Sequence, residues 1–182
     1  MRRIVLTFGL IAGALMSLMM LATVGLLERI DSGRSMIIGY TTMVVAFLFV
    51  YVGVRSYRDN VAGGTVGFGR AFAVGLLIAL VASACYVATW EFVYFRIMPD
   101  FAEKYAARVM EEARTSGATQ AQLDAKAREM ARFQQMYRNP LVNIAYTFLE
   151  PLPVGLVMSL VSAGILRRRR EVPATRTVVQ QE

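Results

Sequence analysis

The sequence contains no histidine and a single cysteine, Cys85. The absence of histidine excludes histidine metal ligands, histidine general bases and Ser-His-Asp triads. One cysteine forms no intrachain disulfide, CxxC redox pair or zinc cluster, and we interpret Cys85, within an apolar stretch, as a small buried hydrophobe. A GxSxG elbow and a zinc motif are also missing. We therefore expect no enzyme, no catalytic residue, no metal and no cofactor.

Charged residues are few as well, at 18% of the chain, whereas 56% of the residues are hydrophobic and the mean hydropathy is +0.47. The apolar residues are gathered into four blocks, 4–27, 36–54, 71–95 and 141–166. Each block has about the 20 residues that cross a bilayer core. The blocks lack the alternation of barrel strands, so the expected fold is an all-α integral membrane protein with four transmembrane helices. The first block is too long for a signal peptide, and we interpret it as a retained helix.

Arginines flank the apolar blocks and predict how the chain is threaded. The positive-inside rule assigns the N-terminus, the loop after the second block and the C-terminus to the cytoplasm. The topology-setting residues are Arg2, Arg3, Arg55, Arg58, Arg167, Arg168, Arg169 and Arg170. Stop-transfer and contact with the lipid bilayer explain the net charge of +7 better than nucleic-acid binding, for which no module is found. We expect no nucleic-acid partner.

The third and fourth blocks are separated by a segment rich in Ala, Glu, Lys, Arg and Gln, which are good helix formers. Apolar residues in it recur at helical spacing and predict two amphipathic helices. Gly117 is suited to end the first helix, and Thr119 with Gln122 is suited to form a capping box for the second. We expect an extracytoplasmic helical hairpin that closes on itself or on the membrane surface, with a partner groove as the alternative.

The chain accordingly divides into four parts. Residues 1–97 hold transmembrane helices 1 to 3 with short loops, and residues 98–140 form the hairpin. Residues 141–170 hold transmembrane helix 4 and its basic stop. Residues 171–182 are short, polar and Pro-containing, so a disordered cytoplasmic tail is expected there.

Small residues recur at intervals of four in three of the apolar blocks, and such ridges let helix backbones approach closely in lipid. The helix-packing residues are Gly9, Gly13 and Ser17, then Gly75 and Ala79, then Gly155 and Ser159. We favour packing within one four-helix bundle. A homo-oligomer that associates through a ridge is the alternative.

An ionisable residue, Glu150, stands in the middle of the fourth block, about 13 Å along the helix from its start. Pro151 and Pro153 each remove a backbone donor, so the carbonyls of Thr147 and Leu149 lose their helical partners. A kink with free oxygens beside a carboxyl is a candidate intramembrane site for a proton or a cation.

A second glutamate, Glu91, lies near the outer end of the third block, with Arg96 as a candidate partner. If Glu91 and Glu150 faced each other, they would share a proton, because burial and mutual repulsion both raise carboxyl pKa values. The structural alternative is that these carboxyls are packing elements, or tie helices together through Tyr146, Asn143 or Arg96. We give the structural alternative the greater weight.

Several stretches together resemble a known family. They are "GLIAGALMSLMML", "GYTTMVVAFLFVYVGVRSYRDN", "GTVGFGRAFAVGLLIALVAS", "CYVATWE", "YRNPL" and "FLEPLPVGLVMSLVSAGIL", and they cover nearly the whole chain. The sequence is similar to the bacterial integral membrane proteins of domain-of-unknown-function family 4199. The resemblance implies a four-helix integral membrane protein with an extracytoplasmic helical insert. It implies no activity and no catalytic residue. We expect the protein to lie in the bacterial inner (cytoplasmic) membrane.

Two functions fit these features. The first is a non-catalytic scaffold or accessory protein of the bacterial envelope that binds an envelope protein partner through the outer hairpin. The alternative is a small oligomeric transporter or proton-coupled permease that uses Glu150 and Glu91.

Overall fold

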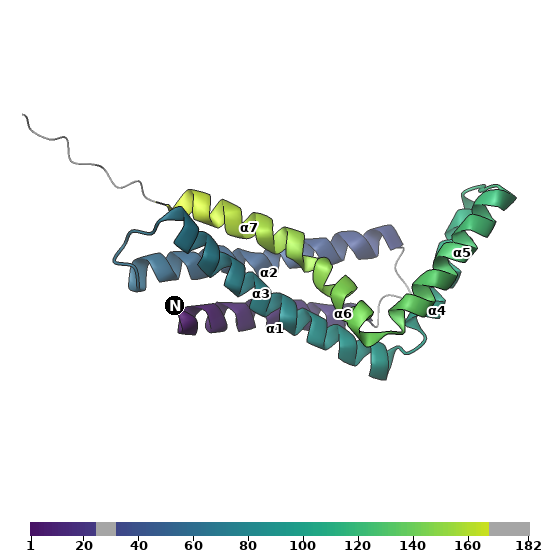
Figure 1. The fold of residues 1–182 in the computed structure, drawn as a ribbon, viewed down its shortest axis with the longest axis horizontal. Helices are drawn as coiled ribbons and strands as arrows, with labels where there is room; N and C mark the ends of the chain where they lie inside the picture. The colour runs from purple at the N-terminus through teal and green to yellow at the C-terminus, as the bar shows by residue number, and fades with distance from the viewer. Residues whose placement is uncertain (25–31, 168–182) are drawn as a thin grey trace, which may run out of the picture.

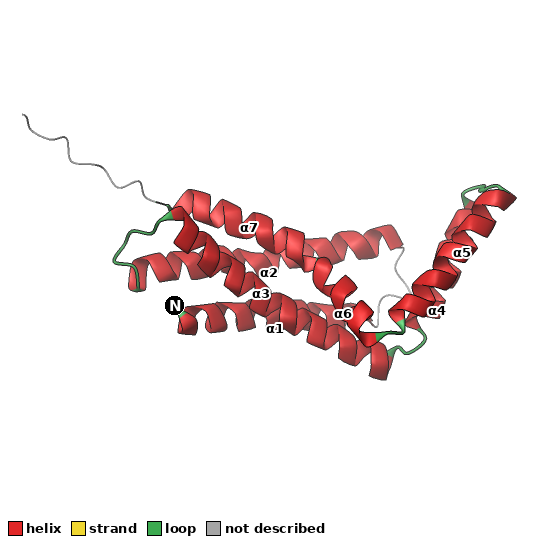
Figure 2. Ribbon diagram, viewed as in Figure 1, coloured by secondary structure: helices red, strands yellow, loops and turns green. Residues whose placement is uncertain are grey.

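The computed structural model describes residues 1–24 and 32–167, which form helices joined by short loops and contain no strand (Figure 2). The all-α prediction is therefore confirmed. In chain order the elements are α1 (Arg2–Val24), α2 (Ser32–Asn60), α3 (Phe68–Phe92), the π-helical turn η1 (Val93–Ile97), α4 (Phe101–Thr115), α5 (Gln120–Tyr137), α6 (Pro140–Leu149) and α7 (Pro151–Leu166). The expectations for Arg168, Arg169, Arg170 and the tail 171–182 lie outside the described residues.

Within these described ranges, four helical segments are long and apolar enough to cross a membrane, as predicted from the apolar blocks. They are Arg2–Thr23, Ile37–Asn60, Phe68–Ile97 and Pro140–Leu166. The fourth segment consists of α6 and α7 joined end to end at Glu150. The outer faces of the segments carry exposed apolar side chains, among them Leu18 and Ile165, which are 64% and 63% exposed. Such faces suit lipid, where apolar side chains need no cover.

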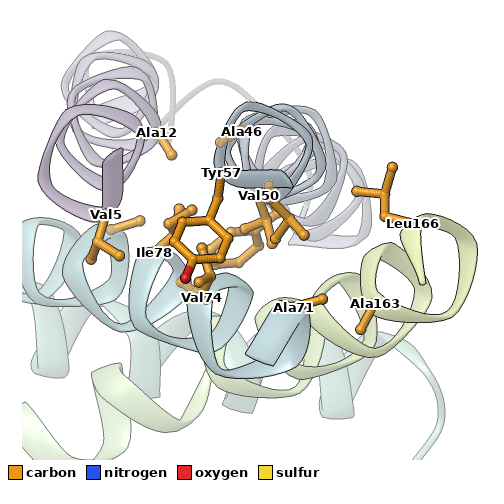
Figure 3. Close-up of a cluster of buried hydrophobic side chains, with 14 of the residues drawn as sticks. Val5, Ala12, Ala46, Val50, Tyr57, Ala71, Val74, Ile78, Ala163 and Leu166 are labelled. Atoms are coloured by element: carbon orange, nitrogen blue, oxygen red, sulfur yellow. The ribbon is translucent and has the colours of Figure 1, made fainter. Parts of the chain in front are cut away.

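The bundle core forms where α1, α2, α3 and α7 meet, and α3 packs against each of the other three (Figure 3). Phe47, Val50, Val74 and Ile78 are fully buried there. Figure 1 places the N-terminus, the loop between α2 and α3 and the end of α7 at one end of the bundle. The hairpin of α4 and α5 lies at the opposite end and projects at an angle to the bundle.

α4 and α5 pack against each other as a helical hairpin, in which the rings of Tyr105 and Phe133 lie 5.5 Å apart between centroids. Gly117 follows α4 with a φ of +77°, in the left-handed conformation that favours glycine. The N–H groups of Gly117 and Ala118 donate to the carbonyls of Arg114 and Ala113, both at 3.1 Å, which is a Schellman arrangement. The predicted capping box of Thr119 and Gln122 then begins α5. Local sequence signals therefore set the turn.

Candidate functional site

Polar and aromatic side chains follow the contact between α3 and α6, where the bundle meets the hairpin. On α3 and the turn after it, Tyr86, Trp90 and Tyr94 are spaced four residues apart and share one face of the helix. α6 runs antiparallel to α3 (Figure 1), so residues late in α6 meet residues early in this row. The three aromatic residues of α3 and its turn therefore make two separate sets of contacts, one near the start of α6 and one near its end.

At the hairpin end, the indole of Trp90 is the centre of a polar contact. Its Nε1–H lies 3.1 Å from both the Tyr137 hydroxyl oxygen and the Asn143 side-chain oxygen. The Thr147 hydroxyl donates to the same Asn143 oxygen at 3.1 Å. These bonds connect α3 to α5 and α6, which come more than 25 residues later in the sequence.

Aromatic rings surround this polar contact. Trp90 meets Phe101 of α4 edge to face at 4.8 Å between ring centroids, and Tyr94 meets Tyr137 at 5.3 Å. Burial raises the pKa of the Tyr137 phenol, so its hydroxyl stays protonated and available for hydrogen bonding. We call Trp90, Tyr94, Phe101, Tyr137 and Asn143 the hairpin joint, because they connect both hairpin helices to the bundle.

Nearer the bundle centre, Oε2 of Glu150 accepts a hydrogen bond of 2.9 Å from the Tyr86 hydroxyl. α6 ends at Leu149 and α7 begins at Pro151, and the chain changes direction between them (Figure 1). Pro151 is buried in the bundle, whereas Pro153 is exposed on its surface. The structure thus places the Glu150 carboxyl at the helix break, with a tyrosine of α3 as its partner.

Glu91 has surroundings of its own. It follows Tyr86 by five residues, so the two side chains point to different sides of α3. The Oε1 atom of Glu91 is buried and lacks a hydrogen-bond partner among the described residues. Within the same part of the chain, no hydrogen bond or ion pair joins Glu91 to Glu150 or to the exposed Arg96. Glu91 therefore lies on a different face of α3 from Tyr86, the residue that Glu150 contacts.

Asn143 has one further unusual feature. The residue is fully buried, and its Nδ2 finds no hydrogen-bond partner in the described part of the chain. A buried amide without a partner costs about 1–3 kcal/mol relative to a satisfied one. Sequence reasoning considered Asn143 only as a tie between helices and missed the roles of Trp90, Thr147 and Tyr137. In the sequence, Asn143, Thr147 and Glu150 are spaced at intervals of four and three residues, which places them on one face of a helix. This spacing was the signal that these polar residues meet the same neighbouring helix.

The small-residue ridges all pack inside the chain. A Cβ added to Gly9 would lie 2.7 Å from Cβ of Val81, and one added to Gly13 would lie 2.6 Å from Cβ of Cys85. Further along the same contact, the Thr89 hydroxyl donates to Ser17 at 2.7 Å. The ridge of α1 therefore lies directly on α3.

The ridges of α3 and α7 meet each other in the same way. A Cβ added to Gly155 would lie 2.9 Å from Cβ of Ala79, and one added to Gly75 would lie 3.2 Å from Cβ of Ser159. α3 is consequently held between α1 and α7 through close backbone contacts on two of its faces.

The described members of the predicted topology-setting set lie at the end opposite the hairpin, whereas Arg96 lies in η1 at the hairpin end. Arg2 and Arg3 begin α1, and Arg55 and Arg58 stand in the last two turns of α2. The guanidinium carbon of Arg167, just after α7, lies 6.0 Å from the ring centroid of Phe68, the first residue of α3. In the described residues, no group of three or more His, Cys, Asp or Glu side chains comes together as metal ligands do.

The architecture defines a class of protein. A helical chain with four apolar, membrane-length segments in its described part is a multi-pass membrane protein. The family described as "Protein of unknown function (DUF4199)" matches residues 7–168, so the chain belongs to that family, as the resemblance indicated. No curated protein and no solved structure matches it.

Proposed function

We propose that this membrane protein is a non-catalytic accessory or scaffold protein of the bacterial inner membrane, and that its hairpin holds an envelope protein partner. The observation that carries the proposal is the hairpin joint. A short helical pair on a flexible connection would sample many directions, whereas this pair is tied to α3 and α6 by Trp90 and Tyr137. An element held at a fixed height and angle above the membrane is suited to positioning another protein.

An ion pair joins the two helices at the base of the hairpin. Arg138, just after α5, forms an ion pair of 3.5 Å with Glu103 in the first turn of α4. Both side chains are exposed, so the pair adds little stability of its own. The pair does join the start of α4 to the end of α5, where both helices leave the bundle. In this proposal the partner binds the outward faces of α4 and α5.

The orientation in the membrane belongs to the same proposal. The end that carries Arg2, Arg3, Arg55, Arg58 and Arg167 is the cytoplasmic end under the positive-inside rule. Both termini are then cytoplasmic, and the hairpin is on the outer side, where it meets envelope proteins.

The test is photo-crosslinking in native membranes from two positions of the full chain. A photoreactive side chain at Ala118, in the hairpin turn, should give one adduct of defined mass, and one at Gly64, at the opposite end, should not. Trp90→Phe should weaken the adduct from Ala118, because it removes the indole N–H from the joint. Tyr105→Phe, which removes a hydroxyl without a hydrogen bond in the described structure, is the matched control. Equal adducts from Ala118 and Gly64, or none from Ala118, would contradict the proposal.

A second candidate, a small oligomeric transporter or proton-coupled permease, is favoured by one observation. The Glu150 carboxyl lies at a helix break inside a membrane-length segment, and intramembrane carboxyls often mark proton paths. Flux in proteoliposomes distinguishes the two functions. Glu150→Gln keeps an oxygen for the Tyr86 bond but carries no titratable proton, and Glu103→Gln in the hairpin is the control. Flux lost only in Glu150→Gln would favour transport over positioning.

A further inference from the structure

A groove of about 600 Å³ runs along α5 where the hairpin meets α6. Its walls include Tyr105 of α4, Arg128, Arg132, Phe133 and Met136 of α5, and Tyr146 of α6. The lining of the groove therefore combines two arginines with aromatic and apolar side chains. It opens to the outside beside the hairpin joint but includes none of the residues of the joint.

The depth of the groove relative to the bilayer follows from α6. The segment Pro140–Leu166 has 27 residues. At a helical rise of about 1.5 Å per residue it is about 40 Å long, so about 5 Å at each end extends beyond a hydrocarbon core of about 30 Å. Tyr146 stands six residues after Pro140, about 9 Å along the helix, and so lies about 4 Å inside the boundary of the core. The Tyr146 side chain is half exposed, as tyrosines at the membrane interface commonly are.

The charge of the groove is not balanced within the described residues. Arg128 and Arg132 are four residues apart on one face of α5, and neither forms an ion pair in that part of the chain. Glu129, which also lines the groove, is held by Lys126 at 2.9 Å. Two arginines without an acidic partner in the described residues thus line one groove, on the helix that directly precedes the membrane-length segment Pro140–Leu166.

We propose that this groove binds an anionic phospholipid. The guanidinium groups of Arg128 and Arg132 contact the headgroup phosphate, for which the planar arginine fork is well suited. The first carbons of the acyl chains lie on Met136 and Tyr146, and the chains continue along the lipid-facing side of α6, where Leu149 is 63% exposed. Two arginines favour a lipid with net negative charge over a zwitterionic one. This binding goes beyond the proposed positioning function and does not depend on a protein partner.

The experiment is native mass spectrometry of the full-length protein in detergent, titrated with phosphatidylglycerol or with phosphatidylcholine of the same acyl chains. The wild type should retain phosphatidylglycerol with saturation and at lower concentration than phosphatidylcholine. Arg128→Gln and Arg132→Gln should each weaken phosphatidylglycerol binding by about tenfold, because each removes a charge-assisted hydrogen bond. Arg132→Lys, which keeps the charge but loses the fork, should give an intermediate loss.

Arg114→Gln is the matched control, since it makes the same charge change in the last turn of α4, away from the groove. It should bind phosphatidylglycerol as the wild type does. The proposal is overturned if Arg114→Gln loses as much binding as the groove variants, if both groove variants bind normally, or if the two lipids are retained equally. All variants change exposed residues, and an unchanged helical circular dichroism spectrum shows that a loss of binding is not a loss of fold.

Discussion

At the scale of single residues, a few polar groups form hydrogen bonds between helices that are distant in the sequence. The Trp90 indole N–H donates to two acceptors, on residues that follow it by 47 and 53 positions. The Tyr86 hydroxyl donates to the carboxyl of Glu150, 64 residues later. In a lipid-facing bundle, where apolar faces contribute no hydrophobic drive for helix association, such hydrogen bonds and close packing decide which helices meet.

The first prediction concerns Trp90. Trp90→Phe keeps an aromatic ring against Phe101 but removes the N–H shared by Tyr137 and Asn143. The buried Asn143 then loses one of its donors, and we expect the free energy of unfolding to fall by about 1–2 kcal/mol. Unfolding by sodium dodecyl sulfate in mixed micelles measures the change. Tyr105→Phe should leave the unfolding curve in place, and an equal shift in both variants would contradict the role given to the indole.

At the scale of elements, close helix contacts and helix-ending turns determine how the helices are placed. One such feature is the close approach of α7 to α3, where Gly155 leaves no space for a side chain beside Ala79. The other is the turn between α4 and α5, whose Schellman arrangement and capping box satisfy the helix ends. The first feature determines how the helices pack, and the second determines where they start and stop.

Gly155→Ala tests the packing feature. The added Cβ would lie 2.9 Å from Cβ of Ala79 and 3.2 Å from Phe47, and since a Cβ moves only with its backbone, α7 must shift away from α3. We expect a loss of about 1–3 kcal/mol in the same unfolding assay. Gly164→Ala in the same helix meets no atom within 4 Å. It should therefore be neutral or raise stability by up to about 1 kcal/mol. Similar behaviour of the two variants would show that the ridge is not a close contact.

Thr119→Ala tests the turn. The substitution removes the hydroxyl that accepts from the Gln122 N–H, and we expect the first turn of α5 to lose about 1 kcal/mol of stability. Hydrogen exchange should become faster at the start of α5 and stay unchanged in α3. Thr115→Ala is the control, because the Thr115 hydroxyl bonds only to carbonyls of its own helix. If exchange near residue 120 stayed the same in Thr119→Ala, the capping box would contribute nothing measurable.

At the scale of the whole molecule, the main feature is the separation of its two ends. The N-terminus and the loop between α2 and α3 lie at one end of the bundle, and the hairpin lies at the other (Figure 1). Arg2, Arg3, Arg55, Arg58 and Arg167 are at the first end, and the groove and the hairpin joint are at the second. A bilayer across the bundle places these two groups of features in different compartments.

This separation predicts a labelling pattern. Cys85→Ser gives a cysteine-free chain with nearly the same side-chain volume, because Cys85 is the only cysteine. In that background, a cysteine at Ala118 should react with a membrane-impermeant maleimide from outside intact cells, and a cysteine at Gly64 should react only after permeabilisation. The reverse pattern would invert the orientation, and labelling of both positions from outside would contradict the four-span arrangement.

Hydropathy and local capping patterns were sufficient to predict the four membrane segments, the two hairpin helices and the turn at Gly117 and Thr119, because each depends on residues close together in the chain. The ionisable residue at the break in the fourth segment was also visible, since Glu150 and its prolines are neighbours. The contacts of the candidate site were not. Whether Glu150 meets Glu91 or Tyr86, and whether Trp90 meets Asn143, depends on the rotation and spacing of helices that lie far apart in the sequence. Only the packing of α1 and α7 on α3, with glycines in close contact, determines that rotation and therefore which polar groups face each other.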